Sequence, residues 1–388
     1  PHPLSRPGQI RQPGLMDDFV AKHLAGVSRT YAILVPMLPA PLDQVVGVAY
    51  LVMRIVDTLE DAPELTTAER LRCFTTLEQA LGAAAMNGQA GPAAQVPAPS
   101  VDDAAAAPAL AQPVGDAAAQ ALARPVGESA DERALMEAIP DVLARFAALQ
   151  PEQRAAIRAC AGHMMAGVRK LIARAAERGL PYPAVRDLPE LREYCYYVAG
   201  VVGEMLCALM ADHLRHPALL NERARAVELG LGLQLVNILK DARADAAHGR
   251  RYLPSLTDRT DPTDLPDPTD LTECTGTAAV ATAPEAASAA PRERAADVYQ
   301  MALREARRCL HTGIDYVLAL PPAATDLRAF CGLPIAWGGL TLARAAADPA
   351  AAKIDRAAVQ ATLARFDELA ADDARLRAWL LSAVAAGD

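Results

Sequence analysis

The sequence predicts an all-α fold, a single large helical bundle around a central cavity. Alanine, the strongest helix former, is abundant among the 388 residues, and aromatic residues make up only 4% of them. Apolar residues recur at helical spacing over long segments, whereas the alternation of apolar and polar residues that is typical of strands is rare. Many long helices without strands are expected to pack as one bundle.

The expected helices follow one another along most of the chain. Several begin with recognisable signals, such as Thr67 ahead of Arg70 and the prolines Pro151 and Pro217 at first helical positions. In chain order, helices are predicted over residues 16–38, 41–61, 66–81, 132–149, 151–178, 188–214, 217–245, 295–319, 325–347 and 355–385.

Two segments of different composition interrupt this pattern. Residues 83–131 form an Ala/Pro/Gly tract that is too poor in large apolar residues to pack, and residues 255–292 contain the sequence Asp-Pro-Thr-Asp-Leu twice. Both are expected to be flexible low-complexity insertions within one domain that spans residues 16–388. Residues 1–15, rich in proline and without periodicity, are expected to be a disordered arm or a tag remnant, with Met16 as a candidate start.

Charge and cysteine content narrow the function classes. The formal net charge of -9 argues against a nucleic-acid surface, because phosphate backbones select basic patches. The seven cysteines include no Cys-x-x-Cys pair, which indicates reduced thiols and a cytoplasmic location. The longest apolar run, residues 198–211, is interrupted by Glu204 and is shorter than the roughly 20 residues that span a membrane. No membrane anchor is therefore expected.

The first acidic cluster lies near the end of the helix expected over residues 41–61. Asp57, Glu60 and Asp61 stand at i, i+3 and i+4 on one helix face, with Arg54 one turn before them. Carboxylates crowded in this way repel one another unless a cation lies among them. Oxygen ligands at this spacing suit a magnesium ion that also binds substrate phosphates.

A second acidic cluster ends the helix expected over residues 217–245. Asp241 and Asp245 stand one turn apart, and Gln234 and Asn237 precede them on about the same face. If the two clusters face each other across the bundle, they would bracket a metal-diphosphate group. The alternative is a pair of exposed helix ends, but the apolar residues before each cluster predict buried helices.

Basic side chains accompany both clusters. Arg54, Lys240, Arg250 and Arg251 could bind phosphate oxygens, since arginine offers a bidentate donor and lysine a point charge. The same residues could simply be ion-pair partners of the nearby carboxylates. The sequence does not distinguish these two roles.

Five sequence blocks resemble the successive signature motifs of the squalene/phytoene synthase family. In order they are SRTYAILVPMLP (residues 28–39), DTLED (57–61), YCYYVAGVVGEM (194–205), LQLVNILKDARAD (233–245) followed by GRRYLP (249–254), and FCGLPIAWGGLTLA (330–343). They occur in the order of the family and span most of the chain. Together the blocks most resemble those of bacterial squalene synthases.

The resemblance implies an isoprenoid synthase fold with a magnesium cluster that binds prenyl diphosphates. The implied metal ligands are Asp57, Glu60, Asp61, Asp241 and Asp245. The implied substrate contacts are Arg29, Gln234, Asn237, Lys240, Arg250 and Phe330, although for Phe330 a core position is the simpler interpretation. The implied catalytic residues are Tyr194, which matches the tyrosine that assists the first half-reaction in the family, together with Tyr50 and Arg54.

The implied reaction is a head-to-head condensation of two allylic diphosphates through a cyclopropylcarbinyl diphosphate. Squalene synthases then reduce the final cation with NADPH, whereas phytoene and dehydrosqualene synthases lose a proton instead. The DTLED and FCGLP blocks favour squalene from two farnesyl diphosphates, and the other product types stay open. Ala244, where many relatives carry an acidic residue, and Lys240, where arginine is frequent, depart from the family pattern.

Two further functions remain open at this point. A terpene cyclase of the same fold would need several aromatic faces around a carbocation, yet the chain has five Phe, two Trp and nine Tyr in all. An inactive prenyl-lipid-binding scaffold is the other, and the retained carboxylates argue against it. The expected partners are prenyl diphosphates, no nucleic acid and, because the product is insoluble, a peripheral membrane contact. The chain is expected to be a monomer or weak dimer.

Overall fold

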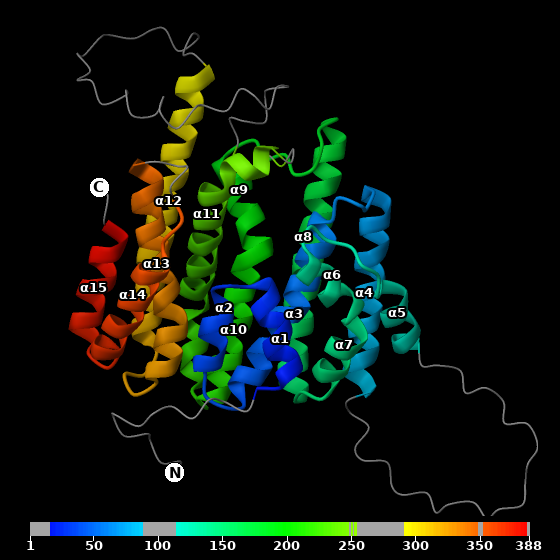
Figure 1. The fold of residues 1–388 in the computed structure, drawn as a ribbon, viewed down its shortest axis with the longest axis horizontal. Coiled ribbons are helices and arrows are strands. Elements are labelled where there is room, and N and C mark those ends of the chain that lie inside the picture. The colour runs from blue at the N-terminus through cyan, green and yellow to red at the C-terminus, as the bar shows by residue number, and fades with distance from the viewer. Residues whose placement is uncertain are drawn as a thin grey trace, which may run out of the picture. The chain divides into compact units, whose positions relative to one another are not determined.

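The computed structural model describes residues 16–87, 114–247, 250, 252–253, 291–347 and 352–385, and its elements there are all helices (Figure 1). The predicted all-α class is thus confirmed. The helices are α1 (Asp18–Val27), α2 (Tyr31–Leu34), η1 (Val35–Met37), α3 (Leu42–Asp61), α4 (Thr67–Asn87), α5 (Val114–Leu122), α6 (Ala130–Glu137), α7 (Ile139–Ala147), α8 (Pro151–Glu177), α9 (Leu188–Cys195), η2 (Tyr196–Gly200), α10 (Val201–His213), η3 (Pro217–Glu222), α11 (Arg223–Ala247), α12 (Pro291–Ala319), α13 (Thr325–Ala347), α14 (Arg356–Leu369) and α15 (Asp373–Ala385).

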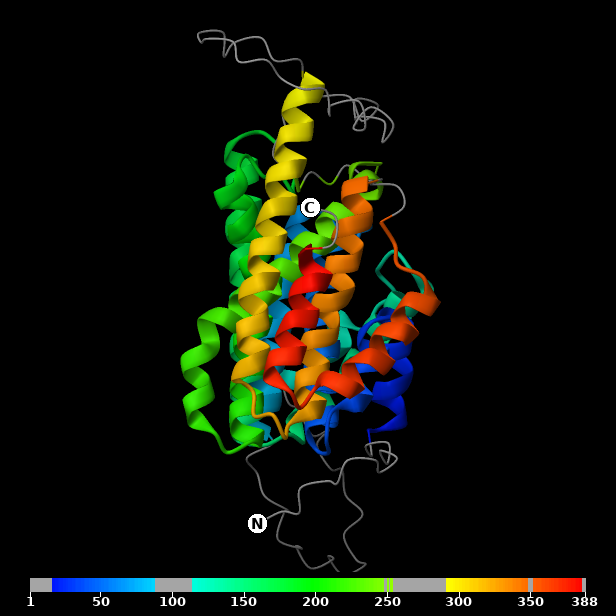
Figure 2. The ribbon, with the colours of Figure 1, turned by 90° about the vertical axis from the view of Figure 1, so that its left-hand side faces the viewer.

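Internal contacts group these helices into two compact units. The N-terminal unit comprises the described residues up to Met165, and the C-terminal unit begins at Ala166, within α8. In the N-terminal unit, α3 packs against α1 and α7, and α4 packs against α5 and α7. In the C-terminal unit, α11 packs against α10, α12 and α13, and α12, α13 and α15 run side by side (Figure 2). The prediction of one domain over residues 16–388 stays a prediction.

Glycines let α11 approach the helix before it at backbone distance. A Cβ atom added to Gly203 would lie 2.2 Å from the carbonyl oxygen of Ala226, and one added to Gly230 would lie 2.4 Å from that of Ala199. No side chain fits such a gap, so both positions require glycine. These contacts fix the axial position of α11 against η2 and α10. They thereby also fix the position of the second acidic cluster within the C-terminal unit.

Three predicted helices are each divided in two. The segment 16–38 breaks after α1, where Ser28 is extended and its Oγ accepts a hydrogen bond from the backbone N–H of Tyr31. The segment 132–149 breaks before Pro140, which lacks the N–H that would continue the ladder, so that α7 starts anew at Ile139. The segment 355–385 breaks between Leu369 and Asp373.

The first low-complexity insertion is narrower than predicted. α4 continues to Asn87, and α5 begins at Val114 and packs against α4 and α7, where the sequence predicted no packed structure. The cause is helical spacing of small apolar residues: Ala119 and Leu122 are 4% and 2% exposed. The remainder of this insertion, nearly all of the second one and residues 1–15 lie outside the described residues.

The continuous helix formed by α9, η2 and α10 is unusually apolar. Leu188–His213 contains an 18-residue window with a mean hydropathy of 1.5, so by length and composition alone it could cross a membrane. It exceeds the predicted apolar run because the helix continues through the π-helical turn η2. Half of that window is buried inside the protein.

Glu190 joins the end of α8 to the start of α9. Its carboxylate, 7% exposed, accepts hydrogen bonds from both guanidinium nitrogens of Arg178, at 2.5 and 3.0 Å, and from Nε of Arg186 at 3.0 Å. Arg178 first, and Arg186 next, lower the pKa of Glu190 from 4.5 to about 2 although burial acts to raise it. The carboxylate is therefore ionised at the pH of any ordinary buffer.

Glu190→Gln should lower the free energy of unfolding at neutral pH and make it vary less with pH in the acid range. Because the folded-state pKa lies below the unfolded one, this stabilisation is present above pH 4.5 and is lost as the pH falls toward 2. The expected loss at neutral pH is about 3 kcal/mol. Denaturant unfolding at a series of pH values measures it, with the exposed Glu177→Gln as control. Parallel stability curves for the Glu190 variant and the wild type would contradict the assignment.

Candidate active site

One candidate site is a polar stripe on α3, in the N-terminal unit. Most of this helix is buried, and the partly exposed positions from its middle onward are Tyr50, Arg54, Asp57 and Asp61, which repeat every three or four residues. Such spacing places them on one side of the helix. Glu60 is instead 2% exposed, so its carboxylate lies in a different environment from the other two predicted metal ligands on this helix.

Arg54 lies between two carboxylates. Its Nη1 donates a hydrogen bond to Oδ2 of Asp57 at 2.5 Å, and its Nη2 donates a short one to Oε1 of Glu132 on α6. Asp57 is the main cause that raises the pKa of Arg54 further above its ordinary value, so the guanidinium is always charged. Both roles that the sequence left open for Arg54 are still compatible with this geometry, because a guanidinium paired at two corners has further N–H groups for phosphate.

Glu132 was not predicted to take part. Burial acts to raise its pKa, but the backbone N–H of Ser129 and the guanidinium of Arg54 outweigh burial, and the pKa is lowered. Its contact with Arg54 joins residues 78 positions apart, which no local pattern reveals. The Ser-x-x-Glu capping box that places it, Ser129 to Glu132, was readable in the sequence.

Aromatic residues border the same stripe. The rings of Tyr31 and Tyr50 lie 5.1 Å apart, at a tilted angle. Burial raises the pKa of Tyr50, so its phenol stays protonated at neutral pH. Arg29, which was predicted to bind substrate, is exposed and forms no ion pair with any residue that the structure describes.

A second polar stripe lies on α11, in the C-terminal unit. Gln234, Asn237, Asp241 and Asp245 are its partly or fully exposed members, while Leu235, Val236, Ile238 and Leu239 between them are buried. This arrangement matches the predicted face of the helix. The predicted ligands of the second cluster therefore do lie together on one surface of α11.

Each aspartate of this stripe has a cationic neighbour. Nζ of Lys240 lies 3.1 Å from Oδ2 of Asp241 and donates a hydrogen bond to Oδ1 of Asn237 at 3.2 Å. Nη1 of Arg250 lies 3.7 Å from Oδ1 of Asp245, and its backbone N–H donates to the carbonyl oxygen of the same residue at 2.8 Å. The half-buried carboxylates, with amide oxygens beside them, are hard donors that fit magnesium.

Tyr194 is brought to the segment that follows α11. Its ring lies 4.8 Å from that of Tyr252, and the two residues are 4% and 8% exposed. Tyr252 belongs to the GRRYLP block, but no role was predicted for it. Phe330 lies within α13 and is 3% exposed, so it packs in the interior, and its role in substrate binding stays a prediction.

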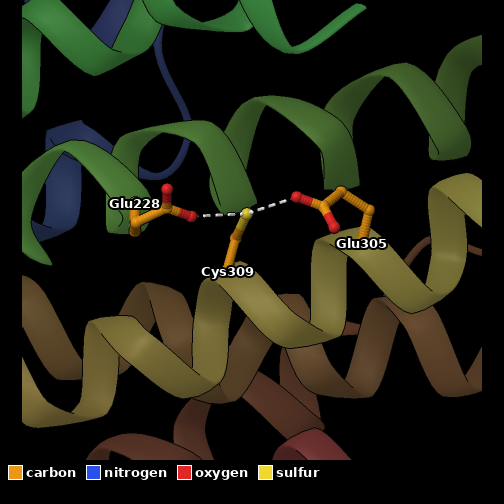
Figure 3. A group of neighbouring side chains, drawn as sticks. All are labelled: Glu228, Glu305 and Cys309. Atoms are coloured by element: carbon orange, nitrogen blue, oxygen red, sulfur yellow. Dashed lines mark hydrogen bonds between the residues drawn. The ribbon is translucent and has the colours of Figure 1, made fainter. Parts of the chain in front are cut away.

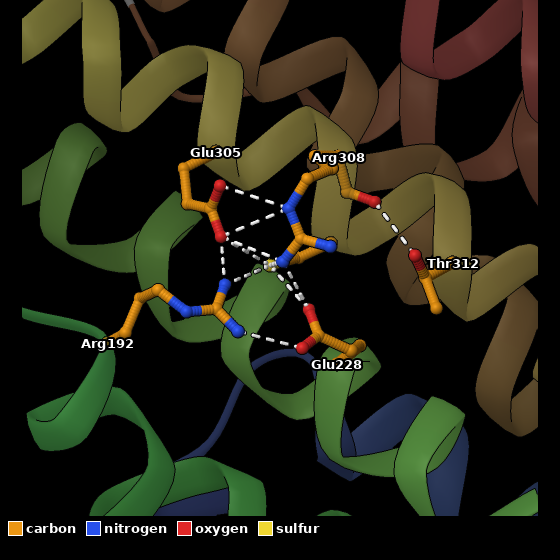
Figure 4. A network of polar contacts seen from close by, with 6 residues as sticks. Arg192, Glu228, Glu305, Arg308 and Thr312 are labelled. Atoms are coloured by element: carbon orange, nitrogen blue, oxygen red, sulfur yellow. Dashed lines mark hydrogen bonds and ion pairs between the residues drawn. The ribbon is translucent and has the colours of Figure 1, made fainter. Parts of the chain in front are cut away.

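A separate cluster in the C-terminal unit has the donor atoms of a metal site. Oxygens of Glu228 on α11 and Glu305 on α12 and the Sγ of Cys309 all lie within 4.8 Å of one another (Figure 3). Arg192 bridges the two carboxylates, with Nη2 2.8 Å from Glu228, and Arg308 contacts them at 2.6 and 2.8 Å (Figure 4). The positive charges of two guanidinium groups thus already neutralise the negative charges of the two carboxylates.

The thiol in that cluster is not activated. Burial is the main cause that raises the pKa of Cys309 to about 12, and its Sγ donates to Oε2 of Glu228 at 3.1 Å. A protonated thiol is a poor metal ligand. We therefore interpret the cluster as a hydrogen-bonded junction of α9, α11 and α12, and not as a metal site.

Fold and site together define a class: an all-helical protein with two carboxylate stripes, each beside basic groups suited to phosphate. The sequence profile of the squalene/phytoene synthase family matches residues 24–365. The chain therefore belongs to the squalene/phytoene synthase family, whose members are magnesium-dependent prenyl transferases.

Individual relatives carry names from both branches of the family. Squalene synthase LSS of Botryococcus braunii is 27% identical over 236 residues, 61% of this chain and 41% of that enzyme. The 15-cis-phytoene synthase of Enterobacter agglomerans is 47% identical over 70 residues, 18% of this chain and 22% of that enzyme. The chain thus aligns with less than half the length of either relative.

A solved structure shares the fold over almost the whole chain. TcSQS in complex with the ligand E5700 superposes with a TM-score of 0.64 at 19% identity, covering 95% of this chain and 97% of that one. At this identity the likeness shows the fold alone. It confirms the predicted all-α isoprenoid synthase architecture.

Proposed function

We propose that this protein joins two farnesyl diphosphates head to head and forms squalene, in a magnesium-dependent reaction that releases pyrophosphate. The observation that carries the proposal is the occurrence of carboxylates beside a basic side chain on the partly exposed faces of α3 and α11, two helices whose buried residues are largely apolar. An inactive scaffold would have no use for carboxylates and cations gathered in this way beside apolar surfaces.

The carboxylates would hold the metal. Asp57 and Asp61 on α3 would bind magnesium directly or through water, and so would Asp241 and Asp245 on α11. When bound, magnesium supplies positive charge that stabilises departing pyrophosphate. Arg54 would donate hydrogen bonds to phosphate oxygens from the N–H groups that its two carboxylate partners leave available.

The remaining predicted residues would orient and protect the reacting groups. Lys240 and Arg250 would bind phosphate oxygens, with Asn237 and Gln234 lining the same surface. Tyr194, buried and fixed by Tyr252, would assist proton transfer in the first half-reaction.

The proposed reaction has two stages, each of which releases one pyrophosphate. In the first, a carbon–oxygen bond of one farnesyl diphosphate breaks, the double bond of the second attacks the allylic cation, and loss of a proton closes a cyclopropane. Pyrophosphate and a proton are released. In the second, the other carbon–oxygen bond breaks and a second pyrophosphate leaves, the ring rearranges to the 1-1' linkage, and NADPH would supply the hydride that quenches the final cation and leave as NADP+.

Phytoene-type condensation is the second candidate. The 47% identity to a phytoene synthase over 70 residues favours it locally, whereas the longer alignment, over 61% of this chain, is to a squalene synthase. The two outcomes differ in substrate length and in the last step, because a phytoene-type enzyme loses a proton where a squalene synthase adds hydride.

Product analysis tests the proposal. The protein is incubated with farnesyl or geranylgeranyl diphosphate and magnesium, with and without NADPH, and the extract is examined by mass spectrometry. We expect pyrophosphate release that stops with EDTA, and squalene only when farnesyl diphosphate and NADPH are both present. Phytoene from the C20 substrate would establish the second candidate instead. A hydrocarbon no larger than its substrate would indicate a cyclase, and no consumption of either substrate would refute both proposals.

A further inference from the structure

The capping box at the start of α6 places the side chain of Glu132. Glu132 is the third residue of α6, where its backbone N–H donates to Oγ of Ser129 at 3.1 Å and its Oε2 accepts from the backbone N–H of Ser129 at 2.9 Å. These reciprocal bonds fix the Glu132 side chain and leave its other oxygen, Oε1, directed at Arg54.

The loop before α6 packs closely against Glu132 and against Thr58 on α3. Gly127 has a φ of 127°, and a Cβ atom there would lie 2.9 Å from Cβ of Glu132 and 3.1 Å from Cγ2 of Thr58 on α3. The loop is held further by Nη1 of Arg133, which donates to the carbonyl oxygen of Gly127 at 2.8 Å. The close approach brings α6 to the acidic end of α3.

We propose that Glu132 is a positioning residue that holds Arg54 so that Asp57 remains available to a magnesium diphosphate. This inference rests on the proposed function. The three side chains carry one net negative charge, because one guanidinium is shared by two carboxylates. Without Glu132, Arg54 and Asp57 form a neutral pair, and a metal ion would have to compete with the whole guanidinium charge for Asp57.

Glu132 also retains Arg54 when Asp57 turns toward a metal. A guanidinium anchored by a second carboxylate loses less conformational entropy when a phosphate binds, because it is already ordered. The side chain of Glu132 is only 12% exposed, so water screens this contact weakly.

The test compares Glu132→Ala with Ser129→Ala. Both changes remove part of the capping box and should lower the melting temperature, but Ser129→Ala leaves the carboxylate of Glu132 in place. We measure binding of magnesium with inorganic pyrophosphate by titration calorimetry, and the magnesium concentration that half-saturates pyrophosphate release. Glu132→Ala should weaken binding and raise the half-saturating concentration, each about tenfold. Ser129→Ala should remain within about twofold of the wild type in both.

Glu132→Gln keeps the shape of the side chain without its charge. Its binding of magnesium pyrophosphate and its half-saturating magnesium concentration should lie between those of Glu132→Ala and Ser129→Ala. Equal losses in Glu132→Ala and Ser129→Ala, or wild-type binding in Glu132→Ala, would overturn the positioning role. If the wild type itself neither binds magnesium pyrophosphate nor releases pyrophosphate from a prenyl diphosphate, it is the proposed function that fails. The outcomes are therefore distinguishable.

Discussion

Asp57→Asn should lower magnesium-dependent pyrophosphate release by on the order of a thousandfold, because a lost metal ligand removes several kcal/mol of transition-state stabilisation. The side chain lies on the partly exposed stripe of α3, 32% exposed, where it can reach a bound ion. Asparagine keeps its size and one acceptor oxygen but not its charge. The effect should be measured as the rate at saturating substrate over a range of magnesium concentrations.

The ion pair with Arg54 offers a competing explanation, which a second variant separates from metal binding. If Asp57 served only to pair with Arg54, then Arg54→Gln would have the same effect on every measurement. If Asp57 binds metal, Asp57→Asn should weaken magnesium binding in calorimetry, whereas Arg54→Gln should strengthen it by removing a competing cation. The control is Glu368→Gln, an exposed carboxylate on α14 paired with Arg365, which should behave as wild type.

A wild-type rate in Asp57→Asn at saturating magnesium would contradict the assignment. Asp241→Asn on α11 should give a loss of similar size if the second stripe also binds metal. Asp241 too has a cationic neighbour, because Nζ of Lys240 lies 3.1 Å from its Oδ2. The parallel makes the two variants independent tests of the same chemistry.

The acidic stripes could be predicted because the helical period alone determines which residues share a face. The exception is instructive: Asp57, Glu60 and Asp61 were assigned to one face, yet Glu60 is 2% exposed. Successive residues are about 100° apart around an α-helix, so residues 60 and 61 diverge even when both lie near residue 57. Only tertiary packing decides which of them is buried.

Contacts between distant segments could not be predicted. The ion pair of Arg54 and Glu132 spans 78 residues, and the contact of Tyr194 with Tyr252 crosses from α9 to the segment after α11. The sequence shows each residue type but not its neighbour. Breaks within helices were missed for a related reason, since helical propensity runs on through the turns at Ser28 and after Leu369, where side-chain capping and packing stop the helix.

A buried arginine that joins several helices was also missed. Arg328, in the first turns of α13, is fully buried, and its guanidinium donates to the carbonyl oxygens of Leu320 at 2.5 and 2.9 Å and of Ala370 at 3.0 Å. These carbonyls follow the ends of α12 and α14, where helices leave acceptors without partners and carry partial negative charge. Its Nη1 also lies 2.7 Å from Oδ1 of Asp373, at the start of α15.

Arg328→Met should lower the free energy of unfolding by about 3–5 kcal/mol, because it leaves buried carbonyl oxygens without donors at the junction of four helices. Arg328→Lys should recover only part of this, since one ammonium group cannot replace the planar fork. Denaturant unfolding measures the loss, with Arg365→Met as the control. That residue forms an exposed pair with Glu368 at 2.5 Å, and its replacement should cost under about 1 kcal/mol. Equal stability of the Arg328 and Arg365 variants would show that the buried guanidinium contributes no more than a surface ion pair.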